Sequence, residues 1–215
     1  MGAGTTGLRI FERLQNRTDI SLLILPEELR KDKKSRKEML NTADIVFLCL
    51  PDDASREAVS WIENPNTVVL DTSTAHRTAP GWTYGFSELV GTETVASSKR
   101  IAVPGCQASG FIALITPLIQ SGLLSAGALL SCFSLTGYSG GGKKMIAEYE
   151  SPDRSVLLDA PRQYALGQMH KHLKEMQASY PADRCTSGCP YRVQPFGSCT
   201  GFHDHEHLRP RPQRE

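Results

Sequence analysis

The segment that decides the fold is ADIVFLCLPDDASREAVSWIENPNTVVLDTST, residues 43–74. It contains two segments of strand length, residues 44–51 and 67–74, and between them residues 54–64 have the composition of a helix. A continuous apolar run such as the first is typical of a strand that is buried on both faces of a parallel sheet. A strand, a helix and a second strand in this order predict a βαβ unit, and hence an α/β fold with a Rossmann-like parallel sheet.

The N-terminal segment MGAGTTGLRIFERLQNR, residues 1–17, predicts a glycine loop that leads into an amphipathic helix. The loop matches G-x-G-x-x-G, in which the glycines allow a tight turn and let a pyrophosphate approach the N-terminus of the helix. The predicted cofactor-binding residues of this loop are Gly2, Gly4, Thr5, Thr6 and Gly7. Only Met1 precedes the loop, where the pattern normally follows a strand, so a plain glycine turn is the alternative.

The apolar run ISLLILP, residues 20–26, predicts a further strand. An acidic residue at its end would read the ribose hydroxyl of NAD, but the chain instead has Arg30, Lys31, Lys33 and Lys34 there. Cations suit a 2′-phosphate, so the sequence favours NADP. A solvated charged helix is the alternative interpretation of the same residues.

The character of the sequence changes after residue 105, where we predict a domain boundary. Residues 1–105 are expected to form the cofactor domain, and residues 106–178 an incomplete α+β substrate domain. Within the second part, GFIALITPLIQSGLL, residues 110–124, predicts a helix that is interrupted near Pro117. GALLSCFSLTGYSGGGKKM, residues 127–145, predicts a strand that ends in a glycine loop.

The tail, residues 179–215, has no sustained apolar periodicity and is predicted to be disordered. It is rich in groups that bind zinc: Cys185, Cys189, Cys199, His203, His205 and His207. The alternating histidines provide no clear tetrahedral set, so we predict no metal site.

Length and charge narrow the functional class. The chain has 215 residues and a net charge of +1, which gives no electrostatic reason to expect nucleic acid or a membrane surface as a partner. No apolar run reaches the roughly 18 residues of a membrane helix, and no basic segment followed by an apolar one marks a signal peptide. We expect a cytoplasmic protein whose cysteines are reduced thiols.

Cys106 has the setting of a nucleophile. It follows Pro104-Gly105 and precedes an apolar helix, and the N-terminus of a helix favours a thiolate. Such a group can attack an acyl carbon and form a thioester. His170 and His172 are the candidate bases. On a helix they would point in different directions, whereas on a strand they would share a face, and we expect at most one of them to face Cys106.

Seven ordered segments resemble N-acetyl-γ-glutamyl-phosphate reductase in its shorter form. They are GAGTTGLRIFERL, ADIVFLCLPDDASREAV, LDTSTAHRT, YGFSEL, VPGC, GYSGGGKKMI and YALGQMHKHLKEM. The resemblance runs from about Gly2 to Met176 and implies a two-domain, NADP-dependent fold related to aspartate-semialdehyde dehydrogenase. Against the family, the first strand and the C-terminal part of the substrate domain are expected to be missing.

The resemblance also implies a reaction in arginine biosynthesis. Cys106 would attack N-acetylglutamyl 5-phosphate, and NADPH would reduce the thioester to the semialdehyde. His170 is the favoured base of the histidine pair, and Ser73 would line the nicotinamide, although strand-end capping explains it equally. The substrate anions would be bound by Arg77 and by Lys143 or Lys144, for which solvated surface charges are the alternative. The family also implies a homo-oligomer.

Two other functions stay open at this stage. One is aspartate-semialdehyde dehydrogenase chemistry on a shorter substrate, against which the segments AHRT, GYSGGGKK and HKH argue. The other is a truncated, non-catalytic remnant that binds at most a nucleotide or a subunit of the intact enzyme.

Overall fold

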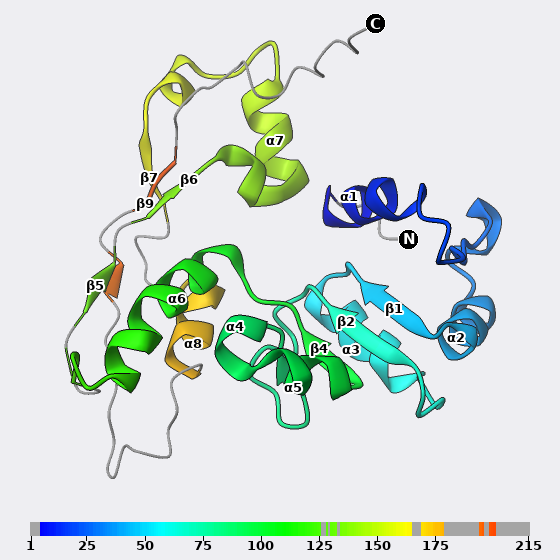
Figure 1. Ribbon diagram of the computed structural model, residues 1–215. Helices are drawn as coiled ribbons and strands as arrows, with labels where there is room; N and C mark the ends of the chain where they lie inside the picture. Colours follow the sequence, from blue (N-terminus) through cyan, green and yellow to red (C-terminus); the bar gives the residue numbers. More distant parts are fainter. Residues whose placement is uncertain are drawn as a thin grey trace, which may run out of the picture. The chain divides into compact units, whose positions relative to one another are not determined.

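The computed structural model describes residues 5–125, 128, 130–132, 134–164, 169–178, 194–195 and 198–200 (Figure 1). The chain divides into two compact units. The first comprises Met1–Leu129 and His170–Arg192, and the second comprises Leu130–Met169 and Val193–Glu215. The first unit is therefore made of two stretches of chain, between which the second unit begins.

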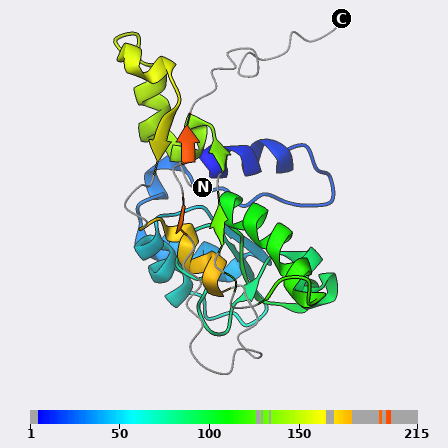
Figure 2. The ribbon, with the colours of Figure 1, turned by 90° about the vertical axis from the view of Figure 1, so that its left-hand side faces the viewer.

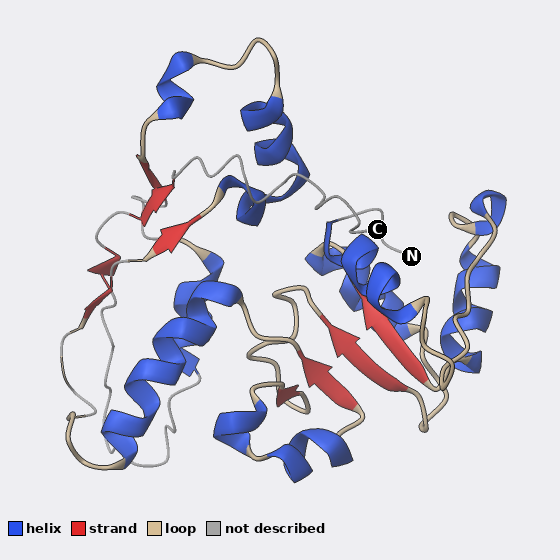
Figure 3. Ribbon diagram, turned by 45° about the horizontal axis from the view of Figure 1, so that its top comes forward, coloured by secondary structure: helices blue, strands red, loops and turns tan. Residues whose placement is uncertain are grey.

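A parallel sheet forms the centre of the first unit. Its strands are β1 (Ile45–Leu48), β2 (Val68–Asp71), β3 (Thr83–Tyr84) and β4 (Arg100–Ala102). They lie in the order β1-β2-β4-β3, and every neighbouring pair is parallel (Figure 3). The predicted α/β class with a parallel sheet is confirmed.

Helix α3 (Asp52–Ser60) joins β1 to β2 and completes the predicted βαβ unit. Its Ala58 packs with Val46, Leu48 and Val69 in the core cluster of the unit. Val46 and Leu48 alternate with exposed neighbours along β1, because successive side chains of a strand point to opposite faces.

The strand predicted at residues 20–26 is wrong, because this segment forms a loop. Its Leu23 and Ile24 are about half exposed, and so are Ile45 and Phe47 on the outer face of β1. β1 is an edge of the sheet among the described residues. An apolar run forms a strand only where a neighbour accepts and donates its ladder hydrogen bonds, and no described strand lies beyond β1.

The helices that precede β1 agree with the sequence pattern. The predicted helix after the glycine loop is α1 (Thr5–Leu14), and the charged segment forms η1 (Glu27–Leu29) and α2 (Lys33–Thr42). The Asp32 carboxylate begins α2 by accepting a hydrogen bond of 2.7 Å from the Ser35 amide.

Two helices that follow the sheet pack against each other. α6 (Cys106–Gln120) follows β4, and α8 (Lys171–Ala178) lies against it (Figures 1 and 2). The predicted interruption at Pro117 is wrong, because α6 continues to Gln120. Proline removes one amide donor, but the next bonds form, and the Ser121 amide donates to the Pro117 carbonyl at 3.0 Å. The short helices α4 (Ser87–Val90) and α5 (Thr92–Ser97) precede β4.

The second unit contains short strands and one longer helix. β5 (Ser131–Cys132) pairs in parallel with β8 (Gln194–Pro195). β9 (Ser198–Thr200) lies between β6 (Leu135–Thr136), to which it is parallel, and β7 (Arg162–Tyr164), to which it is antiparallel.

The predicted strand and glycine loop of this unit are present as β5 and β6 followed by the glycine-rich turn η2 (Tyr138–Gly141). Helix α7 (Gly142–Glu150) and the turn η3 (Val156–Asp159) complete the unit. Tyr138 and Tyr149 stack with ring centroids 4.9 Å apart. Among the helices that the structure describes in either unit, none has both the length and the apolar character needed to cross a membrane.

Candidate active site

Cys106 is the first residue of α6 and is exposed. Gly105 precedes it as the N-cap in an extended conformation, and no side chain caps the helix. Cys49 and Cys132 are half-buried, and burial raises the pKa of both thiols. Among these three described free cysteines, Cys106 alone is both exposed and at the start of a helix, which is the setting that favours a nucleophilic thiolate.

The two candidate histidines lie at the start of α8. His172 is in its first turn and is buried, whereas His170 precedes the helix. Their rings meet edge to face with centroids 4.6 Å apart. Only His172 belongs to α8, so the divergence expected for two residues of one helix does not apply, and which of the two rings faces Cys106 stays a prediction.

His172 lies directly against Gly105. A Cβ atom placed on Gly105 would come within 2.4 Å of the His172 Nε2 atom, closer than real contacts allow. Glycine is therefore required for this approach, and the packing of α8 on α6 brings the imidazole beside the residue that precedes Cys106. The Nδ1 atom of His172 is buried without a hydrogen-bond partner among the described residues.

Burial lowers the pKa of both imidazoles and so favours their neutral forms. It lowers the pKa of His172 to about 4, with the Glu175 carboxylate acting in the opposite direction and His170, Arg77 and Lys171 adding to the lowering. Burial also lowers the pKa of His170, with a further contribution from Lys171. A neutral imidazole at physiological pH can accept a proton, as a general base must.

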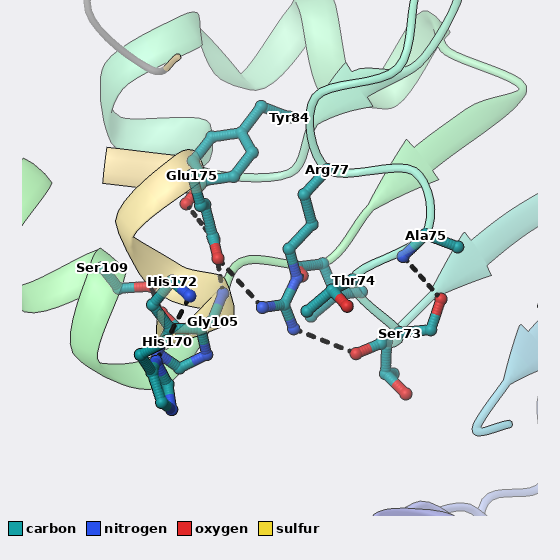
Figure 4. Close-up of polar contacts among 12 residues, drawn as sticks. Ser73, Thr74, Ala75, Arg77, Tyr84, Gly105, Ser109, His170, His172 and Glu175 are labelled. Carbon is teal, nitrogen blue, oxygen red and sulfur yellow. Dashed lines mark hydrogen bonds and ion pairs between the residues drawn. The ribbon is translucent and has the colours of Figure 1, made fainter. Parts of the chain in front are cut away.

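Glu175 is the functional candidate that the sequence analysis missed (Figure 4). Its side chain is 2% exposed and accepts three hydrogen bonds. Oε1 accepts from the Gly105 amide at 2.7 Å and from the Tyr84 hydroxyl at 2.6 Å, and Oε2 accepts from Arg77 Nη1 at 2.9 Å. The sequence spacing could have predicted it, because residues three apart share a helix face and Glu175 follows His172 by three.

Arg77, the predicted substrate-binding cation, lies in the same cluster. Its Nε donates to the Val103 carbonyl at 2.9 Å, and Nη2 donates to the Thr72 carbonyl at 3.0 Å. With the bond to Glu175, all three nitrogens are engaged and the side chain is 8% exposed. The described contacts of Arg77 therefore join the carboxyl ends of β2 and β4 to α8, and binding of substrate stays a prediction.

Ser73, predicted to lie beside the nicotinamide, follows β2 at the carboxyl edge of the sheet. Its hydroxyl donates to Asp71 Oδ2 at 2.7 Å and accepts from the Ala75 amide at 3.1 Å. The same Asp71 oxygen lies 2.6 Å from His76 Nδ1, and the His76 ring stacks on Trp82 with centroids 4.1 Å apart. Neither Asp71 nor His76 was a sequence candidate, and together they fix the loop that carries Ser73.

The remaining predicted site residues belong to other elements of the chain. Lys143 and Lys144 are exposed in the first turn of α7, in the second unit, whereas Cys106 and both histidines belong to the first. Thr5, Thr6 and Gly7 begin α1. Gly2 and Gly4 lie outside the described residues.

Two family models match the chain on either side of Cys106. Residues 22–97 match the model described as "Semialdehyde dehydrogenase, NAD binding domain", and residues 106–187 match "Semialdehyde dehydrogenase, dimerisation domain". This chain belongs to the semialdehyde dehydrogenase superfamily. The resemblance predicted from the motifs is confirmed.

The relatives of this chain include N-acetyl-gamma-glutamyl-phosphate reductases. That of Chelativorans is 50% identical over 178 residues, which cover 81% of this chain and 56% of the relative. N-acetyl-gamma-glutamyl-phosphate reductase 2 of Pseudomonas putida is 49% identical over 176 residues, with the same two coverages. The chain thus spans little more than half the length of the curated relatives it matches.

A solved structure supports the semialdehyde dehydrogenase fold. Aspartate semialdehyde dehydrogenase II from Vibrio cholerae superposes with a TM-score of 0.51 at 14% identity, covering 75% of this chain and 52% of that chain. At this identity, the likeness concerns the fold and not the substrate.

The match to a semialdehyde dehydrogenase NAD binding domain implies a nicotinamide cofactor, and the described residues fit one. Parallel strands place their carboxyl ends at one edge, where dinucleotides bind in such sheets. α1 has no acidic residue in its first turn, whereas α3 begins with Asp52 and Asp53. Phosphates are therefore compatible with the start of α1 and disfavoured at the start of α3.

No cluster of metal ligands occurs among the residues that the structure describes. Of the tail groups considered above, Cys199 lies in β9. The other five, Cys185, Cys189, His203, His205 and His207, lie outside the described residues.

Proposed function

We propose that this chain carries the site for NADPH-dependent reduction of N-acetylglutamyl 5-phosphate to N-acetylglutamate 5-semialdehyde and phosphate, in arginine biosynthesis. The observation that carries the proposal is the exposed Cys106 at the start of α6 with the buried His172 packed against Gly105. The names of the relatives support the substrate.

The chemistry begins at Cys106. Its proton passes to a neutral imidazole, and the sulfur attacks the acyl carbon of the substrate. A carbon–sulfur bond forms, the bond from carbon to the phosphate oxygen breaks, and inorganic phosphate leaves. Bound NADPH supplies the hydride that the reduction of this thioester requires. The sulfur finally leaves as a thiolate beside the protonated imidazole.

Two histidines compete for the role of base. His170 is the residue that the family resemblance favours. The approach of His172 Nε2 to Gly105 supports His172 as the ring nearer the sulfur, with His170 at its edge. We assign proton transfer to this pair, and separate variants distinguish the two members.

The preference for NADP over NAD is part of the same proposal. Lys31 and Lys34 are exposed near the start of α2 and suit a 2′-phosphate. Lys33 is 3.6 Å from Glu57 and lies over the Trp61 ring, so its charge is partly balanced within the protein.

The organisation of the chain follows from the same comparison. We assign residues 1–105 to cofactor binding and residues 106–178 to the catalytic domain, and the match to the dimerisation domain continues beyond them to residue 187. The separate matches on either side of Cys106 support the first boundary. The match to a dimerisation domain supports a homo-oligomer.

The reverse reaction tests the activity. The purified chain is mixed with N-acetylglutamate semialdehyde, phosphate and NADP⁺, and NADPH absorbance is followed. Activity that requires phosphate and disappears in Cys106→Ser, but persists in the matched variant Cys49→Ser, establishes the proposal. A folded, monodisperse chain without activity would contradict it and leave the non-catalytic alternative.

A further inference from the structure

Glu175 is a buried carboxylate that connects distant parts of the first unit. Its hydrogen-bond partners Arg77, Tyr84 and Gly105 precede it by 98, 91 and 70 residues. A buried charge is costly unless it is paired and fully hydrogen-bonded, and this one has both a guanidinium and two further donors. Glu175 and its three partners therefore form a fully hydrogen-bonded buried cluster and not an exposed ion pair.

The bond to Gly105 is the one closest to the nucleophile. Gly105 is the N-cap of α6, which has no side-chain cap, and Cys106 is the next residue. The amide that donates to Glu175 belongs to the Pro104–Gly105 peptide, so this bond holds the backbone one residue before Cys106. Holding the backbone there restricts where α6 begins and therefore where Cys106 can lie.

Two side chains that lie near Glu175, those of His172 and Arg77, occupy the space beside Gly105. A Cβ on Gly105 would lie 2.4 Å from His172 Nε2 and 2.5 Å from Arg77 Nη1. The guanidinium is held by Glu175 Oε2, and His172 is on the same face of α8 as Glu175. One carboxylate therefore holds the backbone before the thiol and the cation beside it.

We propose that Glu175 is a positioning residue for Cys106, acting through the Gly105 amide. This role rests on the proposed function for its purpose, but the contact itself can be measured without turnover. The Tyr84 hydroxyl donates to the same Oε1 atom as the Gly105 amide, so removal of this hydroxyl offers a matched comparison.

The sequence supplies a selective probe of this amide. Pro–Gly pairs occur at Pro80-Gly81 and Pro104-Gly105 and nowhere else in the chain. A chain labelled with ¹³C-carbonyl proline and ¹⁵N-glycine therefore gives two proline-to-glycine amide signals, one from Gly105 and one from Gly81 as internal control. The signals are compared in the wild-type chain, Glu175→Ala, Glu175→Gln and Tyr84→Phe.

We expect the Gly105 amide proton to move upfield in Glu175→Ala, because a carboxylate acceptor is lost, and by less in Glu175→Gln, which keeps an oxygen acceptor. In Tyr84→Phe it moves least, and Gly81 stays in place throughout. An unchanged Gly105 signal in Glu175→Gln and Glu175→Ala would overturn the proposal, as would equal movement of Gly105 and Gly81. If Glu175→Ala does not fold, Glu175→Gln decides alone.

Activity separates this inference from the proposed function. If the chain turns over, kcat in Glu175→Ala falls by about tenfold to a hundredfold while KM changes little, because a displaced nucleophile loses alignment and not binding. An unaltered kcat together with a shifted Gly105 signal would reject the positioning role. If the wild-type chain is inactive, the reductase proposal fails, whereas the amide signals still test the contact.

Discussion

At the scale of single residues, the environment of His172 makes stability depend on pH. Its pKa is about 4 in the folded chain against an ordinary 6.5, so the unfolded chain takes up the proton first as the pH falls. The stabilisation is complete above about pH 6.5 and is lost progressively toward about pH 4. We expect His172→Asn to flatten this loss, as measured by urea unfolding at about pH 7 and about pH 4.5.

His170→Asn is the comparison for this experiment. The pKa of His170 is also lowered, mainly by burial, but His170 is only half-buried whereas His172 is buried. His170→Asn should flatten the curve less. Equal pH dependence in wild type and His172→Asn would show that this imidazole is not held neutral.

At Gly105, the absence of a Cβ atom decides whether the surrounding side chains can pack. Gly105→Ala forces a Cβ against His172 Nε2 and Arg77 Nη1, and overpacking of this kind costs about 1–3 kcal/mol. Gly110→Ala is the matched variant, because a Cβ there meets nothing within 4 Å and Gly110 lies inside α6. It should stabilise by about 0.5–1 kcal/mol. Chemical denaturation of both variants measures the difference, and equal effects would contradict the packing at Gly105.

At the scale of elements, Arg77 joins two strands to a helix through a buried charge pair. Arg77→Met leaves the Glu175 charge without its partner, and we expect a loss of about 3–5 kcal/mol in the free energy of unfolding. Lys33→Met removes an exposed pair with Glu57 and should cost at most about 1 kcal/mol. A loss of similar size in the two variants would show that the Arg77 contact is not a stabilising link.

At the same scale, the sequence predicted elements well where the neighbours of an element were nearby in the chain. Residues 44–74 contain their own strand partner and covering helix, so their pattern was sufficient. Residues 20–26 have the same apolar character but no described partner strand, and they form a loop. The interruption predicted at Pro117 is absent because the packing of α6 outweighs the loss of one backbone hydrogen bond.

In the candidate site, too, the residues that depend on nearby sequence were predictable and those that depend on distant partners were not. Cys106 was predictable from its position at the start of a helix, and the histidines were predictable as a pair. Glu175 was not, because its role depends on three donors that are 70 or more residues away. Sequence spacing places it on the face of His172 but contains no sign of Tyr84 or Gly105.

At the scale of the whole molecule, the exposed side of β1 predicts self-association. Ile45 is 55% and Phe47 is 41% exposed on a strand that is an edge among the described residues. Exposed apolar edges pair with other chains, and a lysine on the edge opposes this. We expect Phe47→Lys to reduce concentration-dependent light scattering, with Thr92→Lys, at an exposed neutral residue and with the same change of +1, as a control for added charge. Equal scattering in wild type and Phe47→Lys would exclude this edge.

Because the site is formed by two separate stretches of chain, its residues are synthesised at different times. On a ribosome, Cys106 is made 69 residues before Glu175 and Gly105 is made 70 before it. At ordinary rates of synthesis this interval lasts about 4–14 seconds. For nearly all of this interval the thiol exists without its carboxylate anchor or either imidazole, so each new chain passes through a stage in which Cys106 is present but the groups that surround it in the folded site are not.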